Sequence, residues 1–216
     1  MAVPMAPHGG QPLETRGKAL GTGRAVLIMI HGRNATPGNI LDLVPALHHP
    51  DVTYIAPAAG GGTWYPLSFL SPIAQNEPGV SSGIAVVHSL IDQAVARGVP
   101  TERIVLLGFS QGACLAATAA QRRPARYGGV IVCSGGLIGP GGTAWSEAGS
   151  FAQTPVLLEC SDRDAHVPEE RVRASASVFE RMGAAVTTRI VPGMGHLVNE
   201  DEIAFTRDLL ETLAAD

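Results

Sequence analysis

The chain has 216 residues, of which 45% are hydrophobic and 16% charged, and its formal net charge is −4. This length suffices for one buried core and is short for two, so we expect a single domain over residues 13–216 after a flexible N-terminal tail over residues 1–12. Lys and Arg are scattered and form no basic stripe, which argues against nucleic acid as a partner.

The cysteines and the apolar runs indicate the compartment. Cys114, Cys133 and Cys160 lie among apolar residues, in an odd number and without the spacing of a disulfide framework or a metal site, so we expect buried free thiols. Residues 1–10 lack a basic start and a continuous apolar segment, and no later apolar run approaches the roughly 18 residues of a membrane span. We therefore expect a cytoplasmic protein without stable membrane insertion.

From residue 25 onward, short apolar runs alternate with segments of helical period, which is typical of βαβ units around a parallel sheet. Strands are predicted over residues 25–30, 52–56, 103–108, 129–133, 155–159 and 186–191, and residues 13–20 are a candidate antiparallel edge strand. Helical faces are predicted over residues 40–47, 84–95, 111–122, 169–182 and 201–215. The fold class is therefore α/β, with a mostly parallel sheet covered by helices on both faces.

Two long connections, residues 57–80 and 134–154, leave the C-terminal ends of strands, where open α/β sheets bind their ligands. Neither is long enough for a separate lid domain. The first contains Trp64, Tyr65 and Phe69, a large part of the chain's few aromatic residues. These aromatics are predicted to form a wall of the substrate pocket; the alternative is that they only pack the loop itself.

The strongest motif is Gly108-Phe109-Ser110-Gln111-Gly112, between an apolar strand and a helix. A strand-to-helix turn this sharp needs small flanking residues and raises the serine hydroxyl above the sheet, which predicts Ser110 as a nucleophile.

A serine hydroxyl needs a base and an orienting acid, which in this arrangement follow in the order Ser, Asp, His. His196 lies on a glycine-rich loop between the last strand and the last helix, and is the candidate base. His166 lies on the loop of the candidate acids and is poorly placed to be oriented by them. Asp162 and Asp164 both follow a strand; Asp164, ahead of Val-Pro and a helix start, is better placed, but both remain candidates.

The oxyanion hole is predicted from two backbone N–H groups, those of Gln111 after the nucleophile and of Arg33 on the loop after the first core strand. His31 is interpreted as a residue that fixes this loop by hydrogen bonding. The Arg33 side chain has two readings: it receives an anionic part of a substrate, or it is a solvated surface group.

The chain resembles the phospholipase/carboxylesterase family of α/β-hydrolases, which includes bacterial carboxylesterases and acyl-protein thioesterases. The motifs that carry this likeness are His31-Gly32, the Ser110 pentapeptide, Asp164 with Val167-Pro168, and Gly195-His196. The chain departs from the family where it reads Arg33-Asn34 after His-Gly.

The resemblance selects Asp164 rather than Asp162 as the acid, and Val167 from the same motif is assigned to the pocket. It also implies a lidless α/β-hydrolase without metal or cofactor, often a homodimer, acting on a small-molecule ester. The expected reaction is hydrolysis of short- to medium-chain carboxylic esters through a Ser-His-Asp triad and an acyl-enzyme. The alternatives are an acyl thioesterase or lysophospholipase with the same triad, and a ligand-binding relative without activity.

Overall fold

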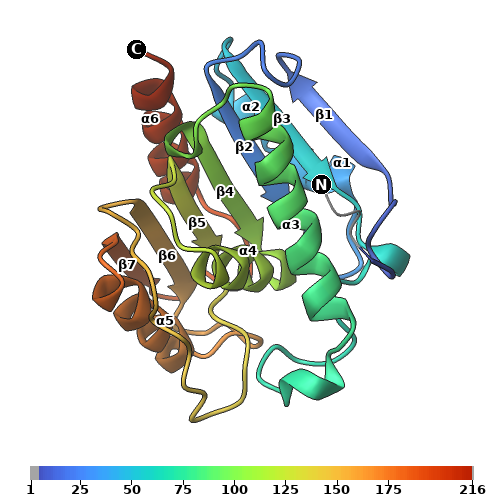
Figure 1. Ribbon diagram of the computed structural model, residues 1–216. Coiled ribbons are helices and arrows are strands. Elements are labelled where there is room, and N and C mark those ends of the chain that lie inside the picture. Colours follow the sequence, from blue (N-terminus) through green and yellow to red (C-terminus); the bar gives the residue numbers. More distant parts are fainter. Residues whose placement is uncertain (1–4, 216) are drawn as a thin grey trace.

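The central sheet has seven strands and is parallel except at one edge (Figure 1). The computed structural model describes residues 5–215. The strand order across the sheet is β1-β3-β2-β4-β5-β6-β7, and β1 pairs antiparallel with β3. The strands are β1 (Leu13–Gly17), β2 (Ala25–Ile30), β3 (Val52–Pro57), β4 (Ile104–Phe109), β5 (Gly129–Cys133), β6 (Pro155–Ser161) and β7 (Ala185–Val191).

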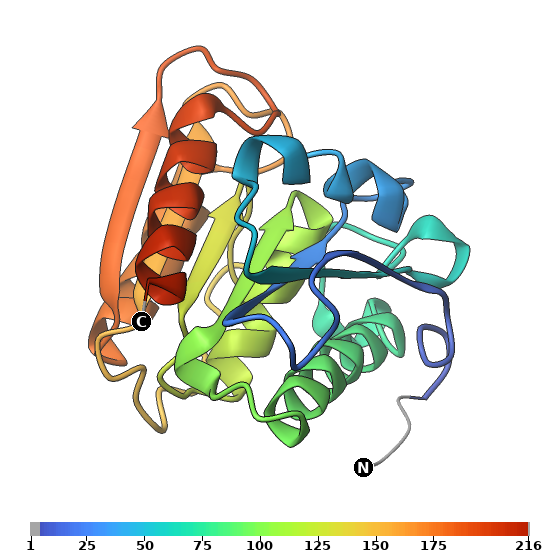
Figure 2. The ribbon, with the colours of Figure 1, turned by 90° about the horizontal axis from the view of Figure 1, so that it is seen from above.

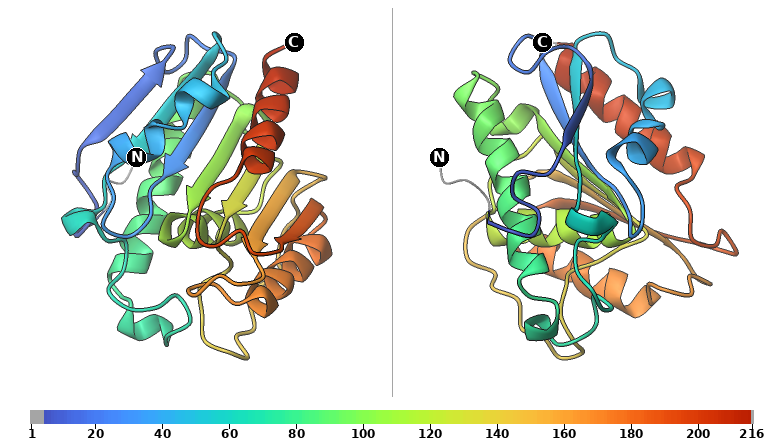
Figure 3. Two further views of the ribbon diagram at one scale, coloured as in Figure 1. Left: turned by 180° about the vertical axis from the view of Figure 1, so that it is seen from behind. Right: turned by 90° about the vertical axis from the view of Figure 1, so that its right-hand side faces the viewer.

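Helices cover both faces of the sheet, as Figure 2 and the rear view in Figure 3 show. The helices α3 (Gly79–Ala96), α4 (Gln111–Arg122) and α5 (Glu169–Arg181) pack on one face, and α1 (Pro37–Leu41), α2 (Val44–Leu47) and α6 (Glu200–Ala214) pack on the other. By length and apolar composition α3 could span a membrane, but 56% of that stretch is buried within the fold. The predicted α/β architecture is confirmed, and residues 5–215 include no separate lid domain.

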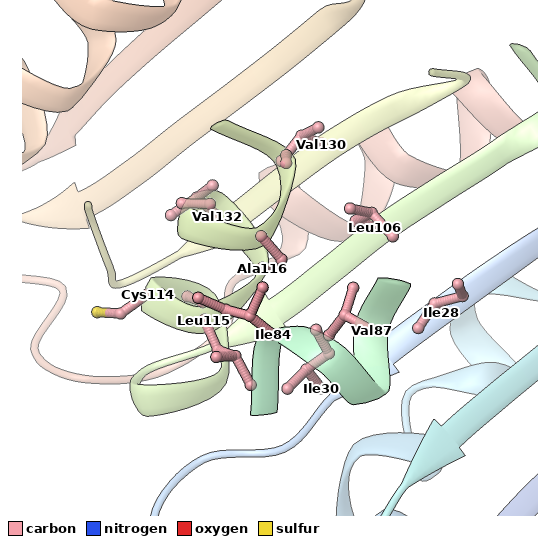
Figure 4. Packing of buried hydrophobic residues seen from close by; sticks show 14 of the residues in the cluster. Ile28, Ile30, Ile84, Val87, Leu106, Cys114, Leu115, Ala116, Val130 and Val132 are labelled. Atoms are coloured by element: carbon pink, nitrogen blue, oxygen red, sulfur yellow. The ribbon is translucent and has the colours of Figure 1, made fainter. Parts of the chain in front are cut away.

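Both faces are apolar because the central strands carry hydrophobic residues at every position and side chains alternate between the faces. In β2, Ile28 and Ile30 point toward α3 and α4, whereas Leu27 and Met29 point toward α1, α2 and α6. Figure 4 shows the first of these clusters, in which Ile28 and Ile30 lie near Val87 of α3.

The predicted strands agree with the structure to within one or two residues at most ends. The segment predicted with one helical face over residues 40–47 is instead two short helices, α1 and α2. Pro45 explains the break, because a proline has no N–H for a helical bond and its ring clashes with the carbonyl four residues earlier.

The residues ahead of β1 differ from a flexible tail over the part that the structure describes, residues 5–12. His8 is buried, its Nε2 lies 2.9 Å from the Trp64 carbonyl oxygen, and its Nδ1 accepts from the Gly60 N–H. Its own N–H donates to the Ser82 hydroxyl. These bonds fasten the segment to the first long connection and to α3.

Candidate active site

Ser110 occupies the tight turn between β4 and α4 with φ 56° and ψ −121°, a conformation that side-chain-bearing residues rarely adopt. The turn is possible because its neighbours are glycines. A Cβ on Gly108 would lie 2.3 Å from the Gly112 carbonyl oxygen, and one on Gly112 would lie 2.1 Å from the carbonyl oxygen of Ile30. Close approach of three backbone segments thus demands both glycines and holds the strained serine.

The structure brings Ser110, His196 and Asp164 together from three loops at the carboxyl edge of the sheet. The Ser110 Oγ lies 2.8 Å from His196 Nε2, and His196 Nδ1 lies 2.7 Å from Asp164 Oδ2. The His196 ring also packs against Phe109 and His166, with ring centroids 4.9 Å apart in each pair. This is the geometry of a nucleophile, a base and an orienting acid.

Asp164 is held on a fixed turn by its other oxygen. The Oδ1 accepts from the N–H groups of His166 and Val167, at 2.8 and 3.1 Å. Burial opposes ionisation of the Asp164 carboxyl, but the hydrogen bonds from His196 and from these two N–H groups outweigh it and lower the pKa. The carboxylate is therefore the stable form beside the imidazole.

Asp162, the other candidate acid, has a different place. Its Oδ1 accepts from the Gly193 N–H at 2.7 Å, and the neighbouring Ser161 hydroxyl accepts from the Gly195 N–H at 3.1 Å. Asp162 and Ser161 thus fasten the loop that carries His196 to the end of β6.

Two buried carboxyl groups lie beneath this loop. Asn199 caps α6 and donates both to Glu159, which is fully buried, and from its backbone N–H to Glu202. Burial raises the pKa of Glu202 to about 8, and the adjacent charge of Glu159 acts in the same direction. The sequence did not predict either group: an acidic residue in a first helical turn, such as Glu202, usually faces solvent, and Glu159 ends an otherwise apolar stretch of β6.

Two backbone N–H groups beside Ser110, one at its turn and one on the loop after β2, are free to bind an oxyanion. Gln111 is the first residue of α4, where an N–H has no partner within the helix. Neither the Gln111 N–H nor the Arg33 N–H has an acceptor within residues 5–215, and both residues line the cavity beside Ser110. β2 and β4 pair with Ile30 opposite Gly108, which brings the two loops side by side.

His31 fixes the first of these loops. Its Nε2 accepts from the Ala59 N–H at 3.1 Å, so Nδ1 carries the proton and donates to the Gly32 carbonyl oxygen at 2.7 Å. Burial lowers the His31 pKa, which favours this neutral form. His31 is thus engaged on both ring nitrogens, away from Ser110.

A cavity of about 580 Å³ opens at Ser110, a size suited to a small-molecule ligand. It lies between the loop after β2, the first long connection and the triad. The residues around it are Gly32, Arg33, Asn34, Ala35, Tyr65, Pro66, Leu67, Ser68, Phe69, Phe109, Ser110, Gln111, Cys114, His166, Val167 and His196.

Of the four residues predicted for the pocket, Tyr65, Phe69 and Val167 line this cavity. Trp64 does not: it is fully buried, and its indole N–H donates to the His31 carbonyl oxygen at 2.9 Å. The indole also packs beside the rings of His8 and His31, so its N–H finds a hydrogen-bond acceptor in the core. Trp64 therefore supports the loop that carries His31 and Arg33.

The Gln111 side chain forms two hydrogen bonds, in addition to the role predicted for the Gln111 N–H. Its carboxamide oxygen accepts from the backbone N–H of Trp64 at 2.8 Å, and its Nε2 donates to the Tyr65 carbonyl oxygen at 2.7 Å. The residue after the nucleophile therefore anchors the cavity wall. A glutamine in a turn carries no sequence signal for such long-range bonding.

Cys114 is the one thiol among the cavity residues. Burial raises its pKa to about 11. A thiol that remains protonated at neutral pH is a poor nucleophile, which leaves Ser110 as the candidate nucleophile of this cavity.

The chain is similar to a known protein family and to a solved structure. A model of the phospholipase/carboxylesterase family matches residues 20–214. The structure is similar to that of a phospholipase/carboxylesterase from Dyadobacter fermentans DSM 18053, with a TM-score of 0.89 and 36% identity over 96% of this chain and 99% of that one.

Two curated proteins are similar over shorter stretches. One, from Oryza sativa subsp. japonica, is named "Probable carboxylesterase" and is 34% identical over 140 residues, 64% of this chain and 51% of the rice protein. The other is acyl-protein thioesterase 1 of Gibberella zeae, 32% identical over 131 residues, 60% of this chain and 56% of that protein. The matched part of the chain therefore spans little more than half the length of these relatives.

Proposed function

The chain belongs to the phospholipase/carboxylesterase family, and on that premise we propose that it hydrolyses small carboxylic esters through an acyl-enzyme on Ser110. The observation that carries the proposal is the continuous hydrogen-bonded chain from Ser110 through His196 to Asp164 at the mouth of the cavity.

In the first half of the reaction, His196 Nε2 accepts the Ser110 proton while Oγ attacks the ester carbonyl. Asp164 holds Nδ1–H and stabilises the imidazolium that forms. The N–H groups of Arg33 and Gln111 bind the negative oxygen of the tetrahedral intermediate. One such donor is typically worth about 10² to 10³ in kcat. Protonation of the leaving alcohol by His196 then breaks the ester bond and leaves the acyl group on Ser110.

In the second half, a water molecule takes the place of the alcohol. His196 accepts its proton, the water oxygen attacks the acyl carbon, and the same two N–H groups bind the new oxyanion. Return of the proton to Oγ releases the carboxylic acid and regenerates Ser110.

The acyl group is short to medium in length, because the cavity is bounded by Tyr65, Phe69 and Val167 and no separate lid domain extends it within residues 5–215. Each methylene that fits contributes up to about 0.8 kcal/mol, so kcat/KM rises with chain length until the cavity is filled.

A series of para-nitrophenyl esters from acetate to palmitate tests the proposal. For the wild type, we expect kcat/KM to rise with acyl-chain length and to fall before palmitate. We expect Ser110→Ala to abolish hydrolysis of every ester in the series. Hydrolysis by a folded Ser110→Ala protein at the wild-type rate would refute the mechanism, and rates still rising at palmitate would refute the short cavity.

The similarity to acyl-protein thioesterase 1 supports a second candidate, hydrolysis of acyl thioesters at the same site. Matched oxygen and sulfur esters of one acyl group distinguish the two functions. The thioesterase would be favoured if the ratio of kcat/KM for the thioester to that for the oxygen ester exceeded the ratio of their uncatalysed hydrolysis rates.

A further inference from the structure

The Arg33 side chain is tethered at the rim of the cavity rather than free in solvent. Its two terminal nitrogens donate to consecutive backbone carbonyls, of Pro66 at 2.9 Å and of Leu67 at 2.6 Å. An exposed arginine ordinarily keeps most of its rotamer freedom. Here two hydrogen bonds already restrict that freedom before any ligand arrives.

The tether leaves part of the guanidinium unused. An arginine carries five N–H donors in a planar fork, and two of them bond the carbonyls of Pro66 and Leu67. The other three have no acceptor within residues 5–215. The two bonded carbonyl oxygens carry no net charge. No carboxylate within residues 5–215 forms an ion pair with Arg33 either, so its positive charge is not neutralised there.

The charge of the cavity is unlike that of the chain as a whole. Asp and Glu outnumber Lys and Arg by 19 to 15, yet the residues around the cavity include one arginine and no acid. The nearby Asp164 has a fully buried side chain and is bonded on the far side of the His196 ring from Ser110. A substrate in the cavity therefore meets a fixed positive charge and no competing carboxylate.

Resting on the hydrolase function proposed above, we propose that Arg33 is a specificity residue that selects esters bearing a carboxylate group in addition to the scissile ester. Its backbone N–H faces the oxyanion while its side chain, a few bonds away, receives the carboxylate. Because the guanidinium is already oriented, the substrate does not have to order it on binding. Carboxylate and guanidinium are matched in charge and in planar geometry.

Matched ester pairs test this selection. Para-nitrophenyl hemisuccinate against para-nitrophenyl butyrate places the carboxylate on the acyl half, and para-carboxyphenyl against para-carbamoylphenyl butyrate places it on the alcohol half. In Arg33→Gln, the ratio of kcat/KM for the anionic to the neutral ester should fall about tenfold on at least one pair. The pair whose ratio falls shows whether Arg33 binds a carboxylate on the acyl half or on the alcohol half of the substrate.

Two further variants separate charge from structure. Arg33→Lys returns the charge and should raise the ratio above that of Arg33→Gln. Arg207→Gln changes the net charge equally at an exposed position on α6 and should leave the ratio at the wild-type value. Equal loss on neutral and anionic esters in Arg33→Gln would reduce Arg33 to a tether for the cavity wall and overturn the inference, as would a tenfold effect of Arg207→Gln.

A binding measurement keeps this inference apart from the proposed reaction. Calorimetry on Ser110→Ala compares monomethyl succinate, an anion, with neutral dimethyl succinate and needs no turnover. Tighter binding of the monoester that is lost on adding Arg33→Gln would support the selection even if no ester were hydrolysed. Equal binding of the two compounds would refute the selection while leaving Ser110-dependent hydrolysis of neutral esters untouched.

Discussion

Replacing Glu202 by glutamine removes a proton-binding group from beneath the His196 loop. Burial, with a smaller contribution from Glu159, raises the Glu202 pKa from 4.5 to about 8, against the opposing effects of the Asn199 N–H, Cys133 and Arg189. The unfolded chain loses this proton above about pH 4.5, whereas the folded protein keeps it until about pH 8. The folded state is therefore favoured at low pH and loses stability across this window.

The expected magnitude follows from proton linkage. Between these two pKa values the free energy of unfolding falls by up to about 1.4 kcal/mol per pH unit, and the loss levels off above pH 8. Glutamine has the shape of the protonated acid and can accept the same N–H bond from Asn199. Glu202→Gln should therefore gain stability relative to the wild type as pH rises from 5 to 8.

Urea unfolding at several pH values between 5 and 9 measures this difference. Glu200→Gln is the control, because it removes an exposed acid from the same helical turn. We expect its pH dependence to follow that of the wild type. Parallel pH curves for the wild type and Glu202→Gln would show that the buried carboxyl ionises as freely as in the unfolded chain and would refute the reasoning.

Three other substitutions probe the site. Asp164→Asn should lower kcat by about 10⁴ while Asp162→Asn, which only loosens the loop, should cost far less; the reverse order would move the acid. Gly112→Ala places a Cβ 2.1 Å from a backbone oxygen of β2 and should destabilise by at least about 2 kcal/mol in thermal unfolding, and an unchanged melting temperature would contradict the close approach. Trp64→Phe leaves the His31 carbonyl without its donor, so it should cost about 1–3 kcal/mol of stability. Unchanged stability together with an altered acyl-chain preference would instead show that Trp64 forms part of the pocket wall.

The fold could be predicted because the information lies in short stretches. Uninterrupted apolar strands and intervening helical periods indicate a covered parallel sheet, and the glycines around Ser110 report a turn that few other residues allow. The order of Ser110, Asp164 and His196 along the chain then restricted the candidates for the site, and the family motif chose between Asp162 and Asp164.

The remaining features depend on contacts between distant segments. Nothing near Trp64 shows that its indole faces the core while Tyr65 faces the cavity, because both side chains are large and aromatic. The bonds of Arg33 to two backbone carbonyls have no sequence signal, since any segment offers carbonyls. Glu202 has the sequence context of an ordinary exposed cap, and only the arrangement of β5, β6 and the His196 loop buries it.

Covalent labelling tests the central claim, that Ser110 is a nucleophile activated by His196, most directly. The protein is treated with a fluorophosphonate at neutral pH and digested, and the adduct is located by mass spectrometry. The account predicts one adduct per chain on Ser110, formed far more slowly in His196→Ala and not at all in Ser110→Ala. No adduct on Ser110, or labelling of another residue that persists in Ser110→Ala, would contradict it.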